Sequence, residues 1–101
     1  MANLTYQQVQ SLMRQVGFPE NQIVLGAAVF RQESGFNPNI IGTLANNEYS
    51  VGIAQINTKV HKRFTVEQLK NPLNNLTDGY YIFSHDKDRR GNLKLWKSWG
   101  G

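Results

Sequence analysis

A carboxyl group stands at the end of the most apolar helical stretch of the chain, "AAVFRQESGFNP", residues 27–38. Phe30 and Val29 precede Glu33 by three and four residues, so the three side chains share one face of a helix. Apolar neighbours on that face disfavour the ionised carboxylate by desolvation, and the negative end of the helix dipole repels it. Both effects raise the pKa of Glu33. A carboxyl group that keeps its proton near neutral pH is suited to general acid catalysis.

The sequence also allows a simpler interpretation of Glu33. A glutamate at the end of a helix can point into water, or it can form an ion pair with Arg31 or Lys62. Metal chemistry is not indicated, because the chain has no cysteine and because His61 and His85 have no partners at ligand spacing. We therefore expect neither a metal site nor a cofactor.

The N-terminal third of the sequence predicts the two helices that position this carboxyl group. Thr5 begins a capping-box pattern that starts the first helix, and Gly17 ends it. Pro19 suits the first position of a second helix, which continues to Gly35. Residues 23–30 are apolar on nearly every side of this second helix, so we expect it to be the buried central helix of the domain.

The rest of the chain predicts a polar loop region followed by a second helical part. Residues 36–58 have no sustained helical period, and residues 40–41 and 51–56 within them indicate a small β-hairpin. After a short capped turn at residues 65–70, a long helix begins at Pro72. A short amphipathic segment, "NLKLWKSW", precedes the terminal glycines. We expect a mainly α fold of the α+β type, in which a loop or small hairpin lines a cleft beside the central helix.

Length and charge limit the possible classes of protein. One hundred and one residues suffice for one compact domain, which we expect to span residues 1–101. The formal net charge of +4 suits an anionic partner such as nucleic acid, a lipid surface or an acidic cell wall, although basic residues also form solvated surfaces. The N-terminus shows no signal-peptide pattern, and the longest apolar run, residues 23–30, is too short to cross a membrane.

Three blocks of sequence follow one another in a defined order: "ESGFNP" at residues 33–38, "GIAQI" at residues 52–56 and "NPLNNLTDG" at residues 71–79. In this order they resemble the soluble lytic transglycosylase and goose-type lysozyme family, whose blocks read approximately E-S-x-x-N-P, G-L-M-Q-I and D/N-P-x-x-N-I-x-x-G. The resemblance covers roughly residues 20–84. The small size and the lack of a signal-peptide pattern look most like a phage-encoded member of this family.

The resemblance implies a lysozyme-like fold and cleavage of the β-1,4 bond between N-acetylmuramic acid and N-acetylglucosamine in peptidoglycan. It assigns Glu33 the role of the catalytic acid, which protonates the oxygen of the leaving sugar. In the transglycosylase reaction the same carboxylate then accepts a proton from the C6 hydroxyl group of the muramic acid, whose oxygen attacks the anomeric carbon. The product is a 1,6-anhydro sugar, and neither water nor a second carboxylate is consumed.

The same blocks suggest roles for other residues. Ser34 follows the acid directly and either contacts substrate or locks the turn through nearby backbone groups. Gln55 matches a cleft-lining position of the family, where it would face the N-acetyl or hydroxyl groups of a sugar, and a buried structural amide is the alternative. Asn75 and Gly79 are expected to be structural and to let the helix of the third block pack closely beside the catalytic helix.

The sequence departs from the family between the first two blocks, where the segment "GTLANNEYS", residues 42–50, lengthens the chain. This segment carries Glu48. Lysozymes that hydrolyse with inversion use a second carboxylate, about 6.5–9.5 Å from the acid, to activate a water molecule. Glu48 is a candidate for that catalytic role, and a solvated loop residue is the alternative. Ser50 is a further polar candidate for contact with substrate.

A second departure lies near the C-terminus, where the family carries an A-Y-N-A-G segment whose tyrosine contacts the catalytic acid. This chain has no such segment and ends in "LWKSWGG". Tyr80 and Tyr81 are the candidates to replace the missing tyrosine. Trp96 and Trp99 are candidate apolar platforms for sugar rings, with a partly buried core pair as the alternative.

Three other functions are compatible with the sequence: a lysozyme-type hydrolase, a non-catalytic cell-wall-binding or virion-structural domain, and a nucleic-acid-binding helical domain. The last would use the basic C-terminal half, but the sequence shows neither a recognition helix nor a basic-aromatic platform. We therefore expect a monomer that acts on peptidoglycan glycan strands, binds no nucleic acid and does not insert into membranes. It would be made in a host cytoplasm and reach the cell wall from a virion or at lysis.

Overall fold

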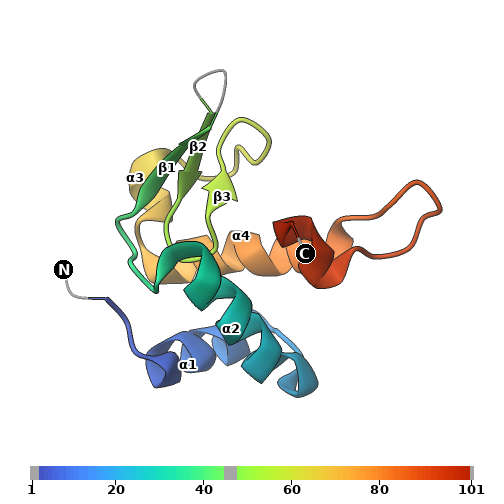
Figure 1. The fold of residues 1–101 in the computed structure, drawn as a ribbon, viewed down its shortest axis with the longest axis horizontal. Coiled ribbons are helices and arrows are strands. Elements are labelled where there is room, and N and C mark those ends of the chain that lie inside the picture. The colour runs from blue at the N-terminus through green and yellow to red at the C-terminus, as the bar shows by residue number, and fades with distance from the viewer. Residues whose placement is uncertain (1–2, 45–47, 101) are drawn as a thin grey trace.

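The computed structural model describes residues 3–44 and 48–100 of the chain. Within these ranges, four α-helices pack beside a small three-stranded antiparallel sheet (Figure 1). This arrangement confirms the expected mainly α fold with a small β part. In chain order the elements are α1 (Tyr6–Val16), η1 (Glu20–Gln22, a 3₁₀ helix), α2 (Ile23–Ser34), β1 (Ile41–Leu44), β2 (Glu48–Val51), β3 (Ile56–Asn57), α3 (Val66–Leu69), α4 (Pro72–His85) and η3 (Leu95–Trp99, a 3₁₀ helix).

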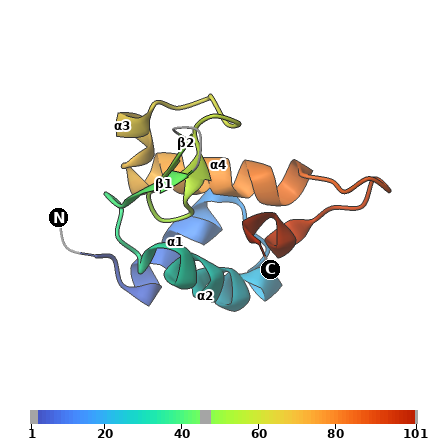
Figure 2. The same cartoon turned by 45° about the horizontal axis from the view of Figure 1, so that its top comes forward.

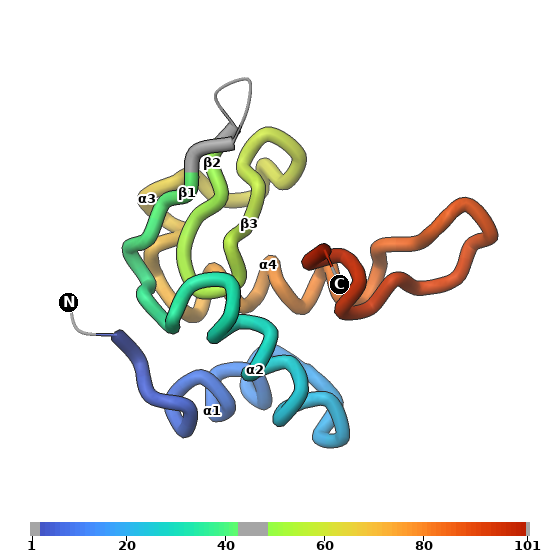
Figure 3. Tube along the Cα trace, viewed as in Figure 1, coloured from blue at the N-terminus to red at the C-terminus, as the bar shows by residue number. Residues whose placement is uncertain are grey.

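The long helix α4 runs through the middle of the molecule, with the sheet and α3 on one side and α1 and α2 on the other (Figures 1 and 2). After α4 the chain makes an excursion away from the body, in which Lys87 and Leu93 form an isolated β-bridge (Figure 3). The chain then returns to η3, which packs against both α4 and α2. No helix in the described part of the chain has the length and apolar character needed to span a membrane.

The helix starts follow the capping signals in the sequence. Thr5 and Thr65 cap α1 and α3, each in a reciprocal capping box with a glutamine three residues later. Asn71 caps α4 by accepting hydrogen bonds from two backbone N–H groups of its first turn, and Pro72 occupies the first helical position. The predicted second helix begins differently, because residues 20–22 form η1 and the α-helical turn starts only at Ile23.

The core lies where α1, α2 and α4 meet. Met13 of α1, Phe30 of α2 and Leu76 of α4 are fully buried there. Phe18, in the connection after α1, stacks on Trp96 of η3 with ring centroids 5.5 Å apart, so the C-terminal segment completes this core. The close packing leaves no room for a side chain at Gly26, where a Cβ atom would overlap the Trp96 ring.

The expectation that α2 is buried on nearly every side is wrong. Val24 and Leu25 are 75% and 55% exposed, and Ala28 is also exposed. Neighbouring elements cover α2 on one side only: α1, η1 and η3 contact it, and the opposite face is left to solvent. Gly26, Ala27 and Phe30 lie on the covered side.

The expected hairpin is present, but the strands lie elsewhere and number three. In the register of β1 and β2, Ile41 lies opposite Val51, and Leu44 lies opposite Glu48. Strand β3 then pairs with the end of β2. Residues 52–55 were expected to belong to a strand. They form a turn between β2 and β3 instead.

Candidate active site

A cleft of about 510 Å³ lies between the sheet, the C-terminal ends of α2 and α4, and η3. Glu33 lines it from the last turn of α2. Polar side chains come from the sheet side, namely Ser50, Gln55 and Asn57. Trp99 of η3 forms the opposite wall. The predicted acid, Glu33, therefore lies in a polar hollow that the sheet and the C-terminal segment form together.

Burial raises the pKa of Glu33 above its ordinary value, in the direction that the sequence predicts. The side chain is half-buried and forms no hydrogen bond or ion pair with any residue in the ranges 3–44 and 48–100. Arg31 does not pair with it, because its guanidinium group lies over the ring of Tyr6, 5.4 Å from the centroid. Glu33 is thus a desolvated carboxyl group that is open to the cleft.

Ser34 fixes the end of the catalytic helix. Its buried hydroxyl group donates to the carbonyl oxygen of Phe30 at 3.0 Å and accepts from the backbone N–H of Phe36 at 3.1 Å. Gly35 adopts a left-handed φ of 61°, which lets the chain reverse directly after α2. Ser34 does not line the cleft, so of its two expected roles the structure contains the one that locks the turn.

Gln55 lines the cleft and also serves as a structural amide. Its Nε2 donates to the carbonyl oxygen of Gly52 at 3.0 Å and lies 3.4 Å from that of Ile40, which ties the turn after β2 to the start of β1. Its backbone has a φ of 51°, a strained conformation for a residue with a side chain. Ser50, also a predicted contact residue, is buried at the floor of the same cleft.

Asn75 joins the second and third sequence blocks. Its buried side chain accepts from the N–H of Ala54 at 2.8 Å and donates to the carbonyl oxygens of Val51 and Leu69 at 2.8 and 3.0 Å. A Cβ atom at Gly79 would lie 3.4 Å from that of Ala54 and 3.8 Å from the ring of Phe30, so α4 packs closely on the turn and on α2, although a methyl group would still fit. The expected structural roles of both residues agree with these contacts.

The two tryptophans occupy different places. Trp99 donates from Nε1 to the carbonyl oxygen of Ala54 at 2.7 Å and lines the cleft beside Glu33. Trp96 donates to Oε1 of Gln22 at 2.8 Å and lines a neighbouring hollow of about 380 Å³. Glu33 and Trp99 line both hollows, so they lie where the two meet.

Neither candidate tyrosine lies beside Glu33. The ring of Tyr80 packs against Phe18, 5.2 Å between centroids, on the core side of α4. Tyr81 is exposed and stacks on His85 at 4.2 Å. The described lining of the cleft contains no tyrosine, and its large aromatic side chain is that of Trp99.

Asp86 and Ser98 line the cleft and were not predicted. Oδ2 of Asp86 accepts a hydrogen bond from the hydroxyl group of Ser98 at 2.9 Å and lies 3.7 Å from Nζ of Lys94. No sequence signal indicated this pair, because Asp86 stands in a charged run that resembles a fraying helix end. Glu48 begins β2, but its side chain lies outside the described part of the structure. In residues 3–44 and 48–100, no three potential metal ligands come together.

The fold and the cleft together define a lysozyme-like domain. A short antiparallel sheet and a helical part enclose the cleft, and the last turn of α2 places a desolvated glutamate, Glu33, in it. Residues 10–99 match the family described as "Lysozyme like domain", and the chain belongs to this family. The family indicates peptidoglycan as the substrate and glycosidase activity in general. A search of curated proteins found no match to the sequence.

Proposed function

We propose that the chain is a lytic transglycosylase that cleaves the β-1,4 bond between N-acetylmuramic acid and N-acetylglucosamine, with Glu33 as the acid and then the base. The observation that carries the proposal is the desolvated carboxyl group of Glu33, which lines the cleft without a partner among the described residues. Family membership supplies the substrate class.

Glu33 suits both proton transfers. Its raised pKa keeps a proton available for the glycosidic oxygen, so that the bond from this oxygen to the anomeric carbon can break. The carboxylate left in a partly desolvated site is a stronger base than one in water. It then takes the proton of the C6 hydroxyl group while the C6 oxygen bonds to the anomeric carbon, which restores the acid and forms the 1,6-anhydro ring.

The walls of the cleft suit a sugar chain. Trp99 offers an apolar ring beside Glu33, and Ser50 and Asn57 offer polar groups from the sheet. Apolar ring faces and a few placed polar groups are the usual combination in small-molecule sites. Because the two hollows meet at Glu33, sugars on both sides of the scissile bond would find space.

A lysozyme-type hydrolase is the second candidate, because Asp86 brings another carboxylate to the same cleft. A second carboxylate can activate a water molecule, as expected above for Glu48. One oxygen of Asp86, Oδ2, already accepts a hydrogen bond from Ser98 and lies near the ammonium group of Lys94.

The test is digestion of purified peptidoglycan by wild type and by Glu33→Gln, followed by mass analysis of the products. We expect anhydromuramyl ends from wild type and a loss of about 10²–10⁴-fold in rate for the variant. Asp86→Asn and Glu48→Gln are the matched controls and should retain anhydro products. Reducing ends that disappear with Asp86→Asn or Glu48→Gln would establish the hydrolase instead.

The site of action is also part of the proposal: a phage-encoded monomer that reaches the wall from a virion or at lysis. The net charge of +4 supports attraction to an acidic wall. Mass spectrometry of purified virions tests the first route, and size-exclusion chromatography tests the monomer.

A further inference from the structure

Beyond His61 the cleft is followed by a second hollow, between α4 and the segment after β3. This hollow, of about 250 Å³, is lined by Val60, His61, Lys62, Arg63, Asp78 and Tyr81. His61 also lines the main cleft, and a smaller hollow that includes Tyr81 and Asp86 lies between the two. Because each hollow shares lining residues with the next, the three lie side by side, and we call this row of hollows the groove.

Asp78 forms the floor of this hollow and carries an unused acceptor. Its side chain is about 5% exposed, and Oδ2 has no hydrogen-bond partner among the described residues. Oδ1 lies 3.9 Å from Nε of Arg63, too far for a good hydrogen bond. A buried carboxylate without a close donor is costly, so a ligand N–H group that reaches the Asp78 carboxylate would stabilise the complex.

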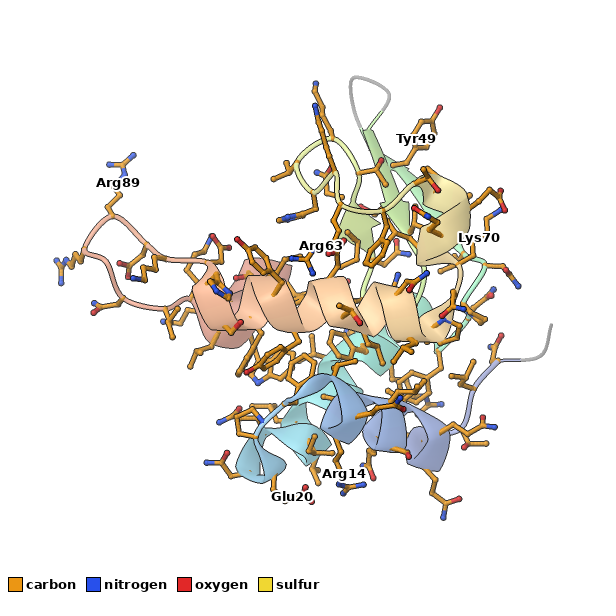
Figure 4. All side chains as sticks on the ribbon, turned by 180° about the vertical axis from the view of Figure 1, so that it is seen from behind. Arg14, Glu20, Tyr49, Arg63, Lys70 and Arg89 are labelled. Atoms are coloured by element: carbon orange, nitrogen blue, oxygen red, sulfur yellow. The ribbon has the colours of Figure 1, made fainter. Side chains whose placement is uncertain are left out.

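The rim of the hollow is positively charged. Lys62 and Arg63 are exposed, and Lys62 has no ion-pair partner in the described part of the chain. The guanidinium group of Arg63 lies over the ring of Tyr81, 5.1 Å from its centroid, which holds it at the groove (Figure 4 shows Arg63 above α4). Carboxylate groups are the natural ligands of such a rim.

We propose that this hollow binds the stem peptide of peptidoglycan, with its carboxylates on Lys62 and Arg63 and an amide or ammonium N–H on Asp78. The inference rests on the proposed function, because the stem peptide is attached to the muramic acid beside the scissile bond. It adds a specificity: peptide-bearing strands are preferred over bare glycan.

The cationic rim and the carboxylate of Asp78 together favour the stem peptide over other components of the cell wall. A phosphate polymer would satisfy the cationic rim but would meet the carboxylate of Asp78. N-acetylglucosamine has no charge for Lys62 and Arg63, and the muramic acid of a bare strand offers only a single lactyl carboxylate. A peptide of alanine, glutamate and a diamino acid carries both carboxylates and N–H donors, and its methyl groups suit Val60, which is 66% exposed at this edge.

The binding test uses the free tetrapeptide L-Ala-D-Glu-diaminopimelate-D-Ala added to ¹⁵N-labelled protein. We expect amide shifts at residues 60–63 and 78–81, and their loss in Lys62→Ala/Arg63→Ala. Arg89→Ala/Arg90→Ala removes the same charge from the remote excursion after α4 and should keep the shifts. Asp78→Asn, which keeps the shape of the side chain, should weaken binding. Absence of shifts, equal loss in both double variants, or shifts produced by polyphosphate but not by the peptide would overturn the inference.

The activity test compares peptide-bearing walls with strands from which an amidase has removed the peptides. The ratio of kcat/KM for the two substrates should fall about tenfold in Lys62→Ala/Arg63→Ala and stay constant in Arg89→Ala/Arg90→Ala. A constant ratio in both variants would contradict the inference while leaving the proposed function intact. No cleavage of either substrate by wild type would contradict the proposed function, and the peptide shifts would then decide the inference alone.

Discussion

Glu33 occupies a position that is unfavourable for a carboxylate, at the C-terminal end of a helix and next to apolar groups. Its surroundings supply no compensating donor among the described residues. Ser34 and Gly35 hold the helix end in place, so the side chain is kept at the cleft by backbone geometry. The arrangement costs stability and favours the protonated form of the carboxyl group. Functional sites are often less stable than they could be in this way.

Trp99 is the second residue on which the proposed activity depends, because it lines the cleft beside Glu33. Trp99→Phe removes the hydrogen bond to the carbonyl oxygen of Ala54 and should lower the free energy of unfolding by about 0.5–1.5 kcal/mol. It should also lower kcat/KM on peptidoglycan about tenfold, because the ring would lose its fixed position beside Glu33. Trp96→Phe, which loses the bond to Gln22, is the matched control. Equal losses of activity in the two variants, measured by turbidity clearing, would contradict a special role for Trp99.

Single residues were predictable where local sequence determines their surroundings. Glu33 could be placed because the helix period aligns it with Val29 and Phe30, and the cause expected for its pKa shift, desolvation, is present. Asp86 could not be found, because its partner Ser98 comes from a segment that folds back after a long excursion. Tyr80 and Tyr81 were chosen by analogy, and tertiary packing places both away from Glu33.

At the scale of elements, one asparagine holds the sheet to the long helix. Asn75→Ala would remove three buried hydrogen bonds and leave their backbone partners unsatisfied. We expect the free energy of unfolding to fall by about 2–5 kcal/mol in urea titrations. Asn74→Ala, one residue earlier, loses only an exposed bond to Gln68 and should cost less than about 1 kcal/mol. Similar costs for the two variants would show that Asn75 does not join these elements.

The starts of the side-chain-capped helices were predictable from the sequence. Which faces of a helix become buried was not. The capping boxes at Thr5 and Thr65 are formed as expected, because they depend on residues three apart. The exposure of Val24 and Leu25 depends on which elements reach α2, and no local pattern contains that information. The third strand was missed for a similar reason, because β3 has only two residues and gains its identity from pairing with β2.

At the scale of the whole molecule, two desolvated carboxyl groups make stability depend on pH. The folded-state pKa values of Glu33 and Asp78 are raised above 4.5 and 3.8, in both cases chiefly by burial. The folded protein therefore binds more protons than the unfolded chain between the ordinary and the raised values. The free energy of unfolding should fall as pH rises through that window, and this stabilisation should be complete only below the ordinary values.

Urea unfolding between about pH 3 and pH 8 measures this dependence. Glu33→Gln should flatten the decline and be more stable than wild type at neutral pH. Glu20→Gln is the control of opposite sign, because the pKa of Glu20 is lowered, first of all by its hydrogen bond from Arg14, and its stabilising effect is lost as pH falls. If the free energy of unfolding of Glu33→Gln fell with pH as steeply as that of wild type, Glu33 would not be desolvated in the folded state.

The most direct test of the central claim is an NMR titration of the ¹³C-labelled side-chain carboxyl group of Glu33, assigned by comparison with Glu33→Gln. We expect the titration midpoint of Glu33 to lie clearly above the ordinary value of 4.5 and to coincide with the pH at which lytic activity begins to fall. A midpoint at or below the ordinary value, with activity unchanged through that pH, would contradict it.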